Sequence, residues 1–470
     1  MAARIQPNGS SSTSVVELEP LSEWPKQTVE IPSVQGPSRQ SKDATPGEKD
    51  TGSLPPPNTA AEVVQRWNYP RSNIPKLAAC FWSFVVMGAN DAAYGPLIPY
   101  IQEYYGLTYV IVSLIFLTPF VGYTAAALLN NVIHHRLGQR GVACVCSGGH
   151  LVSYVIIAAH PPYPLLVIAF MIAGFGNGIA DAAWNAWIGN MARANELLGL
   201  LHGLYGAGAV LSPLIATTMI TKANLPWYSF YYLMIGLATL EIATSISCFW
   251  RENAQAYRDS LARHPGSGSG SGHGSLREAL LKRPGARVSW LCAVFLLGYV
   301  GIEVALGGWI VEFMIQVRQG EAFASGMTAT GFWLGLTIGR VILGFVTPRI
   351  GEKLAIMIYL PAAMGLELLF WLVPQFIVSA VAVGLQGFFL GPLFPAVIVA
   401  MSKLLPRRLH VGAIGFAAAF GGSGAAVLPF AVGAIAQARG VQVLQPIVLA
   451  LLGGILGVWV ALPRLDKRKE

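Results

Sequence analysis

Acidic and amide side chains recur inside an apolar stretch, Gly174 to Asn190, that contains no Lys, Arg or Pro. Read as a helix, the stretch carries a stripe at i, i+4, i+7 and i+8, formed by Asn177, Asp181, Trp184 and Asn185. A carboxylate in such a helix is costly unless it faces a bundle interior or a water-filled cavity. The stripe predicts a solute or proton site in which Asp181 exchanges a proton. The alternative is that Asp181 only holds neighbouring helices together.

A second acid, Asp91, lies in another apolar stretch beside Asn90 and Tyr94. Pro96 and Pro99 follow and free backbone carbonyls at the end of this predicted helix. We expect Asn90, Asp91 and Tyr94 to form hydrogen bonds with a hydroxylated solute. The alternative is a buried acid that anchors the first helix.

Four more polar side chains lie within apolar stretches: His202, Tyr205, Glu303 and Arg340. His202 is a candidate proton shuttle, with simple interhelical bonding as the alternative, and Tyr205 shares its helical face. Glu303 lines the predicted cavity or locks helix packing. Arg340 is expected to pair with an acid or a helix end, in a structural or gating role. The ring of Trp184 stacks on a solute or packs against other aromatic rings.

The composition excludes an ordinary soluble protein. The chain has 470 residues, of which 54% are hydrophobic and 11% charged, against about 25% charged in a typical soluble chain. The net charge of +8 comes from basic residues that lie mostly between apolar segments, which favours a membrane topology signal over nucleic-acid binding. The sequence has no phosphate-binding loop with a Gly-Lys-Ser/Thr ending, no His/Cys metal cluster and no nucleophile–base pair. We therefore expect no cofactor, no metal and no enzymatic activity.

Twelve apolar segments are each long enough to span a bilayer about 30 Å thick. The predicted fold is an all-α membrane protein of two pseudo-symmetric six-helix bundles. We expect a disordered cytoplasmic tail (1–75), an N-terminal bundle (76–250), a cytoplasmic Gly/Ser-rich linker (251–286), a C-terminal bundle (287–463) and a basic cytoplasmic tail (464–470). The twelve predicted spans are 76–100, 110–132, 141–159, 164–190, 197–220, 227–250, 287–315, 323–347, 353–373, 376–402, 410–437 and 442–462.

Basic residues in the short connections set the predicted orientation. Eight fall on one side of the twelve spans and three on the other, so the richer side is assigned to the cytoplasm together with both termini. We expect a multi-pass protein of the plasma membrane rather than of a vacuolar or other internal membrane.

The two halves repeat each other in sequence. The run Gly206-Ala-Gly-Ala-Val-Leu-Ser-Pro213 parallels Gly422-Ser-Gly-Ala-Ala-Val-Leu-Pro429, and Asp91 parallels Glu303. Three such matches occur in the same order at offsets of 212 to 216 residues. They indicate a duplicated six-helix unit with a midplane site between the halves, as in secondary transporters.

The third match identifies a known loop motif. Asn131-Val-Ile-His-His-Arg-Leu-Gly-Gln-Arg140 and Gly344-Phe-Val-Thr-Pro-Arg-Ile-Gly-Glu-Lys353 resemble the Gly-x-x-x-Asp-Arg-x-Gly-Arg-Arg loop of the major facilitator superfamily. The resemblance covers about 76–463 and implies conformational-gating roles for Arg136, Arg140 and Arg349. The motif's Asp, which makes its usual latch to a helix end, is replaced by His135 and Pro348.

Three stretches narrow the resemblance to the fucose–proton symporter-like branch, in its fungal bypass-of-stop-codon-6-like form. They are Gly88 to Pro99, Asp181-Ala-Ala-Trp-Asn185 and Tyr299-Val-Gly-Ile-Glu-Val304. In that branch the first-helix Asp contacts the sugar and the fourth-helix acid carries the proton. The resemblance therefore implies that Asp91 binds solute and that Asp181 cycles a proton.

The predicted function is secondary active transport by alternating access, coupled to H⁺, of a small solute that is sugar-like or otherwise polar. The predicted partners are that solute, H⁺ and the lipid bilayer, and the resemblance implies that a monomer is sufficient. A proton-antiport efflux pump for a toxic or secondary metabolite is one alternative. A receptor or scaffold that transports nothing is another.

Overall fold

Helices form nearly the whole of the part of the chain that the computed structural model describes, residues 65–263, 280–282, 285–406 and 409–463. Helices suit these apolar runs because each backbone amide left unpaired in hydrocarbon costs several kcal/mol. Most of the predicted N-terminal tail, the Gly/Ser run of the linker and the basic C-terminal tail lie outside the described residues.

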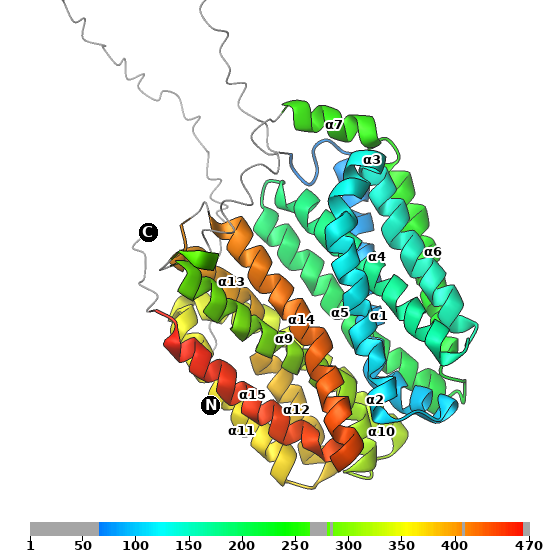
Figure 1. Ribbon diagram of the computed structural model, residues 1–470, viewed down its shortest axis with the longest axis vertical. Coiled ribbons are helices and arrows are strands. Elements are labelled where there is room, and N and C mark those ends of the chain that lie inside the picture. Colours follow the sequence, from blue (N-terminus) through cyan, green and yellow to red (C-terminus); the bar gives the residue numbers. More distant parts are fainter. Residues whose placement is uncertain (1–64, 264–279, 283–284, 407–408, 464–470) are drawn as a thin grey trace, which may run out of the picture. The chain divides into compact units, whose positions relative to one another are not determined.

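The first half contains helices α1 to α6, followed by the connecting helix α7 (Figure 1). Helix α3 contains two of the predicted spans. They are separated at Gly138, where the backbone angles are not helical. Helix α7 lies within the connection that the sequence predicts as a linker. The bounds are α1 Asn73–Tyr105, α2 Tyr109–Val112, α3 Leu114–Ala158, α4 Tyr163–Gly189, α5 Ala194–Thr221, α6 Ser229–Phe249 and α7 Ala254–Arg263.

The second half repeats this order and lies beside the first, as the green-to-red ribbons of Figure 1 show. One predicted span, 376–402, is divided into α12 and α13 at Gly391 and Pro392. The bounds are α9 Gly285–Gln316, α10 Ala322–Ile350, α11 Glu352–Leu372, α12 Phe376–Leu390, α13 Leu393–Leu404, α14 His410–Arg439, the 3₁₀ helix η2 Val441–Val443 and α15 Leu444–Ala461.

Ten stretches of the described residues are long and apolar enough to cross a membrane. One of them, Tyr109–Ala158, includes the break at Gly138 and so corresponds to two predicted spans. The 33-residue helix α1 is not among the ten, because polar residues lower its hydropathy, but it is long enough to cross. The architecture is therefore consistent with twelve spans.

The internal repeat is visible in the helices. Helix α9 begins 212 residues after α1, and α14 begins 216 residues after α5. Gly138 and Gly351, matched by the loop motif, have φ of 69° and 89°. Such angles favour glycine. At Gly138 an added side-chain carbon would also overlap the backbone of Asn253. Both loops of the motif therefore contain glycine where the backbone has a positive φ.

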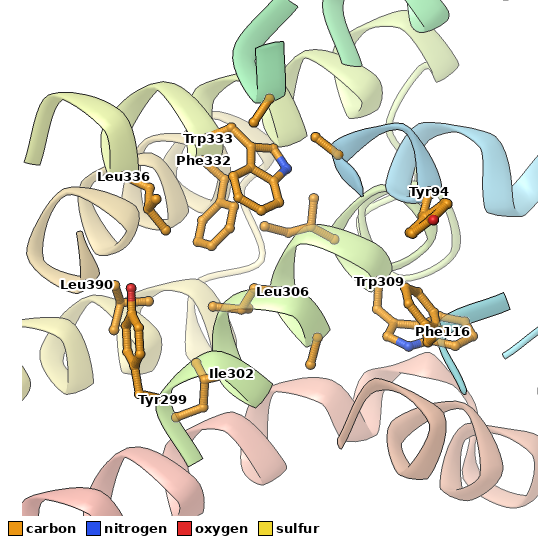
Figure 2. Close-up of a cluster of buried hydrophobic side chains, with 14 of the residues drawn as sticks. Tyr94, Phe116, Tyr299, Ile302, Leu306, Trp309, Phe332, Trp333, Leu336 and Leu390 are labelled. Atoms are coloured by element: carbon orange, nitrogen blue, oxygen red, sulfur yellow. The ribbon is translucent and has the colours of Figure 1, made fainter. Parts of the chain in front are cut away.

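The two halves meet closely at the end of the bundle that the sequence predicts to lie outside the cell. A side-chain carbon at Gly95 in α1 would overlap the carbonyl oxygen of Gly307 in α9. Figure 2 shows Tyr94 and Phe116 of the first half beside Trp309 of the second, and the Phe116 and Trp309 ring centroids are 6.1 Å apart. The missing side chains allow the backbones to touch, and the aromatic rings fill the space around them.

Candidate functional site

Asp91 lies at the centre of a hydrogen-bond network built by α1, α4 and α5. Its Oδ1 accepts from the amide groups of Asn90 at 3.0 Å and Asn177 at 2.9 Å. Its Oδ2 accepts from the hydroxyl of Tyr205 at 3.0 Å. The Asn90 amide also donates to the Tyr94 hydroxyl at 3.0 Å. The structure therefore brings together five predicted solute-site residues around one half-buried carboxylate.

Asp181 lies one turn further along α4, towards the predicted cytoplasmic end. Its Oδ1 accepts from the Asn185 amide at 2.8 Å, and the Asn185 Oδ1 lies 3.2 Å from Nε2 of His202 in α5. Asp181 and Asn185 are half-buried, whereas His202 is exposed. These three predicted residues form a second polar group, next to the Asp91 network.

The second half contributes an ion pair to the same region. Nη2 of Arg340 in α10 donates to both carboxylate oxygens of Glu303 in α9, at 2.9 and 3.1 Å. Nε of Arg340 donates to the carbonyl of Gly391, at the end of α12, at 3.3 Å. The charges of this pair act on Tyr205 and His202 across the boundary between the halves. Arg340 thus pairs with an acid and contacts a helix end.

Trp184, predicted to contact a solute, packs instead in the interior of its own half. Its side chain is fully buried and stacks on Phe249, with ring centroids 4.9 Å apart and planes at 23°. Its indole Nε1 donates to the hydroxyl of Ser83 at 3.2 Å. A tryptophan enclosed in this way has no face for a solute in this structure, so the packing alternative describes it.

Sequence reasoning missed two groups near the site. The ring of Tyr123 in α3 lies against Gly178, within electrostatic reach of Asp91 and Asp181. His150 in α3 forms a fully buried pair with Glu241 in α6. Their signal was available, since a histidine and an acid in two apolar segments of one half are complementary.

The basic residues of the repeated loop contact helix ends within their own half. The guanidinium of Arg140 lies over the ring of Trp250, 4.8 Å from its centroid, just beyond α6. In the second half the Lys353 ammonium donates to carbonyls at the end of α15, including Leu462 at 2.9 Å. A cation is favoured at a helix C-terminus. Arg136 and Arg349 are exposed. Gating by Arg136, Arg140, Arg340 and Arg349 stays a prediction.

Among the described residues no group of three or more His, Cys, Asp or Glu side chains could hold a metal ion. The five cysteines are free thiols in the structure. The site consists of hydroxyl, amide, carboxylate and imidazole groups with one ion pair beside them.

The sequence matches a family model, described as "Major Facilitator Superfamily", over residues 80–358. The chain belongs to the major facilitator superfamily. It is 30% identical over 418 residues to "Bypass of stop codon protein 6" of Saccharomyces cerevisiae, covering 84% of each chain. It is 23% identical to the "Glucose/mannose transporter GlcP" of Bacillus subtilis, covering 74% of this chain and 85% of that one.

Solved structures of superfamily transporters have the same fold. FucP in its outward conformation superposes with a TM-score of 0.57 at 17% identity, covering 83% of this chain and 98% of that one. A D-xylose–proton symporter superposes with a TM-score of 0.64 at 13% identity, with the same coverage. This superfamily member is therefore a multi-pass integral membrane transporter of a small solute, and the predicted recognition and fold class are confirmed.

Proposed function

We propose that this transporter moves a small polyhydroxylated solute together with H⁺, with Asp91 as the solute-binding acid and Asp181 as the proton carrier. The observation that carries the proposal is the Asp91 network. One half-buried carboxylate accepts three hydrogen bonds from Asn90, Asn177 and Tyr205, and these belong to three different helices.

The chemistry of this network suits sugar hydroxyls. Each hydroxyl both donates and accepts, so a sugar can donate to Asp91 while its oxygens accept from amide and tyrosine groups. Such a site rejects an analogue that lacks the hydroxyls, because its own polar groups would then be left unpaired. The activities of two similar proteins, a glucose/mannose transporter and a D-xylose–proton symporter, support a sugar-like solute.

The surroundings of Asp181 suit proton exchange. Its carboxylate is half-buried and has one amide donor, Asn185. The exposed His202 lies beyond that amide and gives a route towards the predicted cytoplasmic end. Protonation cancels the charge of Asp181, which lowers the cost of moving the site between the two membrane faces.

Proton movement in proteoliposomes tests the proposal. Sugars and polyols, beginning with D-glucose and D-mannose, are added outside while the external pH is followed. We expect alkalinisation with at least one solute, and its loss in Asp181→Asn with retained solute exchange. Glu367→Gln is the matched control. Glu367, in α11 of the second half, is a buried acid that accepts a hydrogen bond from Gln386 in α12.

Two results would contradict the proposal. Uphill accumulation by Asp181→Asn would remove Asp181 as the proton carrier. Silence across the panel, with an imposed acidic lumen driving uptake of amphipathic compounds, would indicate an antiport exporter.

We also propose that both termini are cytoplasmic and that the protein resides in the plasma membrane, which protease access to intact cells tests.

A further inference from the structure

A buried acid–base pair lies behind the solute site and has no role in the transport scheme above. Nδ1 of His150 lies 2.9 Å from Oε2 of Glu241, and both side chains are fully buried. The hydroxyl of Ser83 donates to the other carboxylate oxygen at 2.6 Å and accepts from the indole of Trp184. Both oxygens of Glu241 and one nitrogen of His150 are thus occupied, by contacts that join α1, α3 and α6.

The second nitrogen of the imidazole faces the solute site and has no hydrogen-bond partner. It lies against α4, where a side-chain carbon added to Gly176 would be 2.9 Å from His150 Nε2. The next residue, Asn177, interacts with the His150 side chain. Its amide oxygen, also buried, likewise has no partner, while its amide nitrogen donates to Asp91. One buried asparagine therefore separates His150 from the solute-binding acid.

The two protonation states of the pair differ in what Nε2 offers to Asn177. With an imidazolium beside a carboxylate, the pair is neutral overall and Nε2–H donates. After one proton leaves, the pair carries one negative charge and Nε2 accepts. The amide oxygen of Asn177 can only accept, so it pairs with the first state. In the second state the amide nitrogen of Asn177 can donate to Nε2. Turning the amide to do so places its oxygen, instead of its nitrogen, against the Asp91 carboxylate.

We propose that the His150–Glu241 pair is a second proton-binding site, which sets the orientation of the Asn177 amide and thereby the strength of solute binding at Asp91. The proposal rests on the proposed function, in which Asp91 binds solute. His150 and Glu241 act through Asn177 and are positioning residues. The proton comes from water and returns to water. Because both side chains are fully buried in this structure, that exchange belongs to another conformation of the transport cycle.

Other titratable groups surround the pair. Asp91 of α1 acts on the imidazole directly, whereas Tyr94 of α1 and Tyr231 of α6 lie near Tyr154, and Cys80 of α1 lies near Cys146. On α3 itself Tyr154 stacks on the imidazole, with centroids 5.9 Å apart, and Cys146 lies one turn away. The group that α4 presents, Asn177, does not titrate. Any pH experiment must therefore distinguish protonation of the pair from protonation of Asp91. A variant at Asn177, which lies between them, makes that distinction.

Nuclear magnetic resonance of ¹⁵N-histidine in the full-length protein in nanodiscs tests the site without any solute. The signal absent in His150→Gln assigns the residue. We expect it to change from imidazolium to neutral imidazole between about pH 5 and 8, the range in which histidine changes its charge. Asn177→Leu should shift that midpoint, because it removes the acceptor of Nε2–H. An unchanged His150 signal over the whole range would overturn the proposal.

Solute uptake tests the coupling, with D-glucose and D-mannose as probes. In the wild type the KM should rise about tenfold as the pair loses its proton, the change expected for losing one hydrogen bond to a charged group. The double variant His150→Gln/Glu241→Gln avoids a lone buried charge and should show a flat KM with kcat retained. Glu367→Gln, the matched acid variant, should behave as the wild type.

The two proposals fail in different ways. A wild type that moves protons with the solute, beside a double variant with the same pH profile, overturns the coupled pair and leaves the proposed function standing. A wild type that moves no sugar or polyol overturns the proposed function, and the histidine titration then decides the proton site by itself.

Discussion

The carboxylate of Asp91 has three donors but no cation among the partners that the described residues show for it. A charge in an apolar bundle is tolerated when hydrogen bonds replace its lost hydration. Donors that can rotate away also leave room for a solute hydroxyl. Hydrogen-bond donors alone therefore hold this acid ready for ligand exchange, whereas an arginine would hold it as a fixed ion pair.

Replacing Tyr205 with Phe removes one of the three donors while preserving the ring. We expect solute binding to weaken about tenfold, because a hydrogen bond to a charged group contributes roughly 1.5–3 kcal/mol and tenfold is about 1.4 kcal/mol. Equilibrium binding of the transported solute measures the change. Tyr359→Phe, whose hydroxyl lies 3.3 Å from Thr347 in the second half, is the control. Equal affinity in the two variants would remove Tyr205 from the site.

The Glu303–Arg340 pair behaves differently, because both its members are largely buried. Glu303→Gln leaves the guanidinium without its counter-charge and should destabilise the protein by about 3 kcal/mol, near the lower limit for breaking a buried pair. The double variant Glu303→Gln/Arg340→Gln should recover much of this loss. Thermal unfolding in detergent measures both. Equal melting temperatures for the single and double variants would show that the pair does not act as a unit.

Helices α1 and α9 approach each other through glycine at the predicted outer end. Gly95 faces the backbone of Gly307, and Gly308 faces the ring of Phe116. A packed contact of this kind is either made or broken, so it behaves as a two-state element.

Gly95→Leu should shift the transporter towards the state that is open at the predicted outer end, since the side chain cannot fit against Gly307. We expect faster modification of a cysteine introduced at Tyr109 by a membrane-impermeant reagent added outside. Gly236→Leu is the control, because no atom lies within 4 Å of a carbon added at that glycine of α6. Unchanged labelling would show that this contact does not close the outer end.

Several contacts between the halves lie at the predicted outer end of the molecule. The hydroxyl of Tyr109 donates to Glu312 at 2.9 Å, and its backbone amide donates to Gln437 at 2.8 Å. Near the same end, Lys222 lies over the ring of Phe323. His202, in the site but towards the opposite end, is exposed. We propose that the structure is the state of an alternating-access cycle that is closed at the predicted outer end.

A disulfide across this end should stop the cycle. A carbon added at Gly326 would lie 2.8 Å from Cβ of Thr217, so a small separation of α5 and α10 gives the usual 3.5–4.5 Å of a disulfide. Oxidised Thr217→Cys/Gly326→Cys should lose transport, and a reductant should restore it. Each single variant is its own control. Full transport by the cross-linked protein would show that these helices need not separate.

The sequence determined the membrane class, the duplicated helices and most members of the site, because hydropathy, helical period and loop motifs are local properties. The tertiary structure decided what each face meets. On α4, at 100° per residue, Asn177 and Trp184 point 20° apart, while Asp181 and Asn185 lie 40° and 80° round from Asn177. The first two are buried and the second two half-buried. Of the predicted stripe, Trp184 therefore packs in the interior of its own half and Asn177 reaches Asp91 from a buried position, while Asp181 and Asn185 form the second, half-buried polar group.

The same reason explains the missed pair. The sequence shows that His150 and Glu241 are intramembrane, but only the packing of α3 against α6 places their side chains 2.9 Å apart. It likewise gives Arg340 its partner, Glu303, by bringing α10 beside α9. Because desolvation is costly, a buried charge needs a partner of opposite charge. Which helix supplies that partner depends on the tilt and rotation of whole helices, which no single segment encodes.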